Sequence, residues 1–102
     1  MKQLPTATID AIALNAVGEE ILRARSKHAP MNSAHEAYAV ILEELDELWD
    51  EVKKKRESRS KDAMRSELVQ IAAMAVRAIA DLDLVPIHQP TGYELAGTPN
   101  AE

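Results

Sequence analysis

Apolar residues recur every three or four positions in three stretches of the chain. This spacing places side chains on one face of an α-helix. The stretches cover about residues 9–27, 34–56 and 62–83. No stretch alternates between apolar and polar residues in the way that a half-buried strand requires. The pattern therefore predicts an all-α fold of about three helices.

Local signals mark where these helices begin. Ser33 and Glu36 have the spacing of a capping box, in which the two side chains accept hydrogen bonds from backbone amides at the helix start. Short polar side chains at the other two helix starts have the same capping chemistry. These further candidate caps are Thr6 or Thr8 for the first helix and Ser60 or Asp62 for the third.

Prolines mark where the helices end. Pro30 enforces a break after the first helix, because the residue before a proline disfavours the helical conformation. Pro86 ends the third helix, and further prolines and glycines follow it. We expect one all-α domain over residues 1–85 and an extended or disordered tail over residues 86–102.

The composition indicates how the helices pack. Of the 102 residues 46% are hydrophobic, yet there is no Phe, one Trp and two Tyr, so small aliphatic side chains must fill the interior. Three such helices leave their long apolar faces poorly covered. The sequence therefore predicts a bundle that is completed by oligomerisation, as a homodimer or homotetramer.

Charge and cysteine content exclude several classes of function. The formal net charge is −5, which argues against nucleic acid as a partner, because phosphate backbones are bound by clustered Lys and Arg. With no cysteine, the chain forms no disulfide, thiolate zinc site or cysteine nucleophile. The sequence shows neither a signal-peptide pattern nor a membrane-spanning stretch. We expect a soluble, cytoplasmic protein with no membrane partner.

Six carboxylates lie within the nine residues from Glu43 to Glu51, inside the second predicted helix. Glu44, Glu47 and Glu51 form a stripe along one edge of its apolar face. Like charges at these spacings repel one another. The cluster is therefore either a solvated helix face or part of a site for a divalent cation, which would need further acids from another helix.

The third predicted helix offers such groups. Glu67 and Gln70 share a stripe beside its apolar face. If this helix packs antiparallel to the second, Glu67 approaches Glu44 and Glu47. Three carboxylates and an amide oxygen make a hard, all-oxygen environment, which suits Mg²⁺ or Mn²⁺. A di-iron bundle is excluded, because no histidine follows a glutamate by three positions.

These residues resemble a known family. The segment Glu43-Glu44-Leu45-Asp46-Glu47, a gap of nineteen residues and then Glu67 are similar to the all-α MazG-like nucleoside triphosphate pyrophosphohydrolases. Their pattern is a Glu-Glu-x-x-Glu helix followed by a Glu-x-x-Asp helix, and short members are often encoded by phages. The resemblance implies Mg²⁺-dependent hydrolysis of (deoxy)nucleoside triphosphates to monophosphate and pyrophosphate, in an oligomeric helical core.

The resemblance also implies roles for individual residues. Glu44, Glu47 and Glu67 match metal-binding positions, and Glu43 matches an acid that orients or deprotonates the attacking water. Gln70 stands where the family usually has Asp; its amide oxygen can ligate Mg²⁺ but carries no charge. The candidate substrate contacts are Arg77 and Lys54 for the triphosphate and Trp49 for the base.

Alternatives remain open for several of these residues. Arg77 is either a phosphate contact or an ion-pair partner of Asp81. Core packing is the favoured interpretation of Trp49 and of Tyr38, which lie on the apolar face. The alternative function is a non-catalytic helical oligomer of the same fold that binds a nucleotide or a protein partner, and Gln70 favours it.

Overall fold

The computed structural model describes residues 3–85, and the regular structure within this range is entirely helical. It consists of α1 (Thr6–Lys27), α2 (Ala34–Val52), a short 3₁₀ turn η1 (Arg56–Ser58) and α3 (Lys61–Asp81). The predicted all-α fold with three helices is thus confirmed for the described residues. The tail predicted for residues 86–102 lies outside them.

Two helices begin at the serines expected to cap them. The Glu36 N–H donates to Ser33 Oγ at 3.0 Å, and the Ala63 N–H donates to Ser60 Oγ at 3.0 Å. Glu36 accepts from the Asn32 N–H at 2.6 Å, one residue before the cap, and not from the Ser33 N–H as a capping box requires. Both serines are therefore confirmed as caps, and of the two candidates for α3 the cap is Ser60.

The start of α1 differs from the expectation. Pro5 occupies the cap position with an extended backbone, and no side chain caps this helix. The carbonyl of Pro5 accepts from the N–H groups of Thr8 and Ile9, so the helix is already formed at Thr6. The prediction that Thr6 or Thr8 is the cap was therefore wrong.

The second helix ends at Val52, four residues before the predicted boundary. The reason is the connection that follows it. Glu51 accepts a hydrogen bond from the Ser60 N–H at 2.6 Å, and Arg59 donates to the carbonyl of Val52 at 2.9 Å. These contacts turn the chain back toward α3 directly after the last turn of α2.

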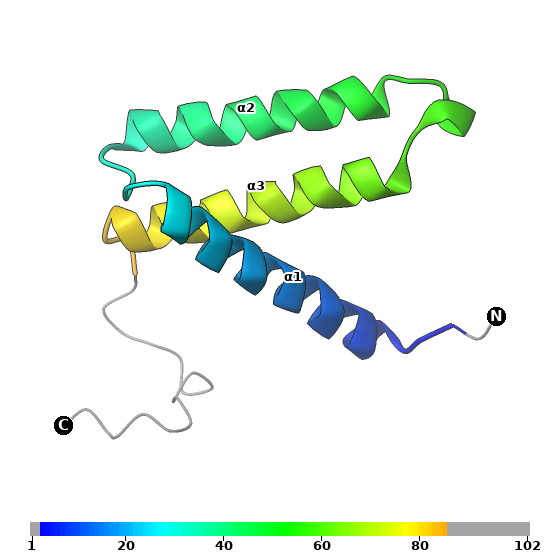
Figure 1. The fold of residues 1–102 in the computed structure, drawn as a ribbon, viewed down its shortest axis with the longest axis horizontal. Helices are drawn as coiled ribbons and strands as arrows, with labels where there is room; N and C mark the ends of the chain where they lie inside the picture. Colours follow the sequence, from blue (N-terminus) through cyan, green and yellow to red (C-terminus); the bar gives the residue numbers. More distant parts are fainter. Residues whose placement is uncertain (1–2, 86–102) are drawn as a thin grey trace.

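The third helix is the central element of the fold. Both α1 and α2 pack against it, and α2 runs beside it in the antiparallel direction (Figure 1). α1 crosses α3 near its C-terminal half and diverges from it toward the N-terminus of α1 (Figure 1). Small side chains and methionine fill the contact, as the composition predicted. The buried core consists of Ala24, Met31, Ala37, Ala73, Met74 and Ala78.

Large apolar side chains remain exposed in the single chain. Leu14, Leu22, Tyr38 and Trp49 are 71%, 72%, 69% and 58% exposed. The core-packing interpretation of Tyr38 and Trp49 was thus wrong for the isolated chain, because α3 covers only one side of the broad apolar surface of α2. None of the described helices is long and apolar enough to cross a membrane.

One carboxylate fastens the loop between α1 and α2 to the end of α3. Asp81 accepts from Arg25 at 2.6 Å and from the Met31 N–H at 2.8 Å. Arg77 donates to the carbonyl of Ala29 in the same loop at 3.2 Å. Asp81 is therefore paired with Arg25, and the alternative ion pair between Arg77 and Asp81 does not form. The loop is held over the C-terminal half of α3.

Candidate functional site

Three glutamates converge where α2 packs against α3. Glu44 and Glu47 lie one turn apart on α2, and Glu67 lies on α3. Each offers a carboxylate oxygen, and these three atoms lie within 4.8 Å of one another. The expected approach of Glu67 to the two glutamates of α2 is confirmed. Their role as metal ligands stays a prediction.

A carboxylate oxygen of Glu67 lacks a hydrogen-bond partner among the described residues. Glu67 Oε1 is buried and makes no hydrogen bond to any group in the described part of the chain. Leaving a buried polar atom without a partner costs on the order of 1–3 kcal/mol. A cation between the three carboxylates would supply the missing interaction.

The cluster also perturbs the acidity of its members. Burial, together with the neighbouring Glu67 and Glu47, raises the pKa of Glu44 to about 7. The charge of Glu67, and then partial burial, raises the pKa of Glu47. Repulsion between carboxylates that share a site contributes to both shifts, although burial is the larger cause for Glu44. A bound divalent cation would attract all three carboxylates, and this attraction would outweigh the repulsion between them.

The donor set fits magnesium. Mg²⁺ prefers carboxylate oxygens at about 2.0–2.1 Å, so two ligands on opposite sides of it lie about 4.2 Å apart. The three glutamate oxygens already lie within 4.8 Å of one another, so small side-chain movements suffice. Three carboxylates leave octahedral positions for water or phosphate oxygens.

Gln70 contacts the cluster in a different way from the one expected. With its amide nitrogen turned toward α2, it donates to the two carboxylate oxygens of Glu44 at 2.7 and 3.1 Å. This orientation satisfies hydrogen bonding on both sides. Gln70 therefore holds Glu44 in place, while its expected role as a metal ligand stays a prediction and would need the opposite amide orientation.

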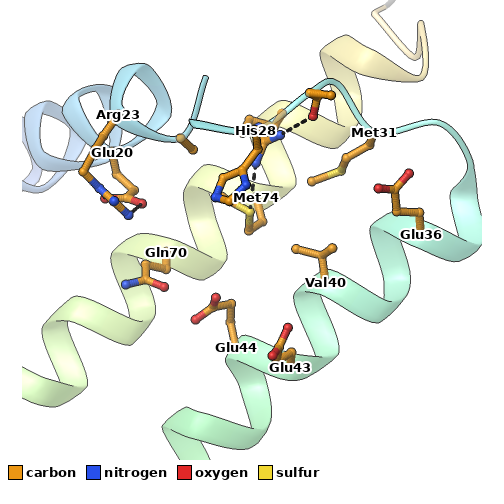
Figure 2. Close-up of a pocket in the computed structure, with 13 residues that line it drawn as sticks. Glu20, Arg23, His28, Met31, Glu36, Val40, Glu43, Glu44, Gln70 and Met74 are labelled. Carbon is orange, nitrogen blue, oxygen red and sulfur yellow. Dashed lines mark hydrogen bonds and ion pairs between the residues drawn. The ribbon is translucent and has the colours of Figure 1, made fainter. Parts of the chain in front are cut away.

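A cavity of about 350 Å³ opens beside the cluster, between the three helices and the loop that joins α1 to α2. Glu44 and Gln70 lie at one end of it, and Met74 lies farther along α3 (Figure 2). Glu43 also lines the cavity from α2 (Figure 2). Glu44 therefore belongs both to the carboxylate cluster that suits a cation and to the wall of a cavity that suits a small molecule.

The other predicted site residues are distributed unevenly. Arg77 lines the cavity and is buried, but it lies ten residues beyond Glu67 on α3. Lys54 lies past the end of α2, where it pairs with Glu51 at 3.0 Å, and it does not line the cavity. Trp49 is exposed and also outside the cavity. The structure therefore brings Glu43 and Arg77 to the cavity but not Lys54 or Trp49, whose substrate contacts stay predictions.

Sequence reasoning missed the contribution of α1. Glu20 and Arg23 lie on one side of the cavity and pair with each other (Figure 2). The hydrogen bond from Arg23 lowers the pKa of Glu20. Only the crossing of α1 over α3 places these two side chains at the cavity.

Comparisons of the chain with protein-family models, with curated proteins and with solved structures find no match.

Proposed function

We propose that the protein hydrolyses (deoxy)nucleoside triphosphates to monophosphate and pyrophosphate with the help of Mg²⁺, or of Mn²⁺ in its place. The observation that carries the proposal is the convergence of Glu44, Glu47 and Glu67 around a buried, unpartnered carboxylate oxygen beside a cavity. The MazG-like pattern of acids supports it from the sequence. Such an enzyme serves to cleanse or control the nucleotide pool.

The residues divide the chemistry between them. When bound, Mg²⁺ neutralises phosphate charge that would otherwise repel a nucleophile. Glu44, Glu47 and Glu67 would hold the ion, and Gln70 would steady Glu44 through its amide. Glu43 lies in the cavity wall, where its carboxylate would orient a water and take its proton. The water oxygen then bonds to the α- or the β-phosphorus, and the P–O bond that joins these two phosphates breaks. Monophosphate and pyrophosphate then separate.

The uncovered apolar surface supports the oligomeric part of the proposal. Besides the exposed side chains of α2, an apolar groove of about 500 Å³ separates α1 from α3, and Val17, Met64 and Leu68 line it. Contiguous exposed apolar surface is typical of an interaction site. We propose a homodimer or homotetramer in the cytoplasm, where its nucleotide substrates are found.

Pyrophosphate release from a panel of dNTPs and NTPs, with and without MgCl₂, tests the proposal. Glu44→Gln and Glu67→Gln remove one ligand charge each. We expect each to lower kcat by about 100-fold or more, because charge stabilisation by a bound metal is worth several kcal/mol. Glu19→Gln, on the exposed surface of α1, is the matched control and should keep the parent activity. A parent chain that releases no pyrophosphate from any nucleotide would refute the enzymatic function.

A second candidate is a non-catalytic oligomer of the same fold that binds a nucleotide or a protein partner. Gln70 favours it, because an amide beside Glu44 adds no negative charge for a second cation. The same assay separates the two functions. An inactive parent that binds nucleotide, together with activity gained by Gln70→Asp, would establish the second candidate.

A further inference from the structure

Arg77 is a buried cation in the wall of the cavity, well along α3 from Glu67, and Glu36 of α2 lines the same cavity. Arg77 is 4% exposed, and among the described residues it donates hydrogen bonds to Met74 Sδ at 3.4 Å and to the carbonyl of Ala29. Its Nε is buried and has no partner among the described residues. Within residues 3–85, no carboxylate lies within ion-pair distance of it. A guanidinium has five N–H donors and keeps its charge, so Arg77 can donate further hydrogen bonds to an acceptor in the cavity.

The position of Arg77 along α3 decides which part of a nucleotide it would meet. It follows Gln70 by seven residues and Glu67 by ten, which corresponds to about 10 and 15 Å along a helix. Phosphates bound through a cation at the glutamates would lie beside Glu67. The nucleoside extends away from them, so its base, and not the triphosphate, would reach Arg77.

Several apolar side chains of the cavity wall suit a flat ring. Val40 from α2 and the methionines Met31 and Met74 line the cavity (Figure 2), and so does Ala24 from α1. Apolar side chains combined with convergent polar groups are typical of small-molecule sites. Thioether sulfurs also make favourable contacts with aromatic rings.

The donor-only chemistry of arginine then distinguishes between bases. A 6-oxopurine presents two acceptors, O6 and N7, on one edge, and arginine binds this pair with two N–H groups. Adenine places an amino donor beside N7, which opposes the donors of arginine. We propose that Arg77 binds the O6 and N7 edge of the base, so that the substrate class is the guanine- and hypoxanthine-containing nucleoside triphosphates. This inference rests on the proposed function for the position of the phosphates.

Binding of two matched monophosphates tests the inference without catalysis. dIMP and dAMP differ only at position 6 of the purine and in the proton on N1. Isothermal titration calorimetry of the full chain with MgCl₂ should give a dissociation constant for dIMP that is about tenfold or more lower than for dAMP. dGMP should bind like dIMP. Equal binding of dIMP and dAMP by the parent chain would overturn the inference.

Variants at Arg77 separate base recognition from a structural role. Arg77→Met should bring the two dissociation constants together, whereas the loss of the contact with Ala29 alone would weaken both equally and leave their ratio unchanged. Arg65→Met, on an exposed turn of the same helix, is the control and should keep the ratio of the dissociation constants of dAMP and dIMP.

Circular dichroism checks whether each variant is folded. If Arg77→Met does not fold, Arg77→Lys keeps the charge but not the paired donors, and it should still reduce the ratio. A ratio that survives in the folded variants would contradict the inference.

Hydrolysis of dITP and dATP distinguishes this inference from the proposed function. Preferential binding of dIMP without any pyrophosphate release would retain base recognition and refute the enzyme. Equal hydrolysis of both triphosphates would retain the enzyme and refute base recognition.

Discussion

Glu44 links protonation to the stability of the fold. Its pKa of about 7 in the folded chain lies above the ordinary value of 4.5, so between these values the folded state binds the proton more tightly than the unfolded state. The stabilisation from this group is complete below pH 4.5 and is lost as the pH rises through about 7. Mg²⁺ would reverse the trend, because it binds the ionised carboxylate.

Thermal unfolding between pH 5 and 8 therefore provides a test at the scale of this residue. Without divalent cations, we expect the melting temperature to fall with rising pH; MgCl₂ should raise it most at pH 8. Glu44→Gln should remove the part of the pH dependence that Glu44 causes, and with it much of the response to MgCl₂. A parent chain whose response to MgCl₂ is the same at every pH would contradict the assignment of Glu44 as a ligand.

At the scale of the helices, Gly18 is a weakness in the middle of α1. A Cβ added there meets nothing within 4 Å, so the chain has space for a side chain. Glycine costs roughly 0.5–1 kcal/mol relative to alanine inside a helix, because it loses more backbone freedom on folding. Gly18→Ala should therefore raise the free energy of unfolding by about this amount. Urea denaturation measures it, and Ala16→Gly, two residues earlier, should change stability in the opposite direction.

The helices also show which parts of the structure the sequence could predict. The capping serines and the approach of Glu67 to Glu44 depend on local spacing and on one antiparallel contact, and both were predicted. The cavity was not predicted, because it depends on how α1 crosses α3, which involves residues far apart in the sequence. Periodicity also identified Trp49 as apolar without showing which side of the broad apolar surface of α2 meets α3.

At the scale of the whole molecule, the exposed apolar surface predicts self-association. Leu45 is 49% exposed on α2, between Tyr38 and Trp49 in the sequence. Leu45→Glu would place a charge on this surface and should shift the chain toward the monomer, as measured by light scattering after size-exclusion chromatography. Asp46→Asn, at an exposed neighbouring position, should leave the mass unchanged. A parent chain that is monomeric at all concentrations would refute the predicted oligomer.

The alanines in the core have a consequence for the cavity. Ala24 on α1 and Ala73 and Ala78 on α3 belong to one buried cluster, and Ala73 is 0% exposed. Because each contributes only a methyl group, the backbones of the two helices can approach closely where they cross. The size of these alanine side chains therefore limits how closely α1 and α3 approach each other. Side-chain volume at Ala73 thus sets how wide the cavity opens, although Ala73 itself does not line it.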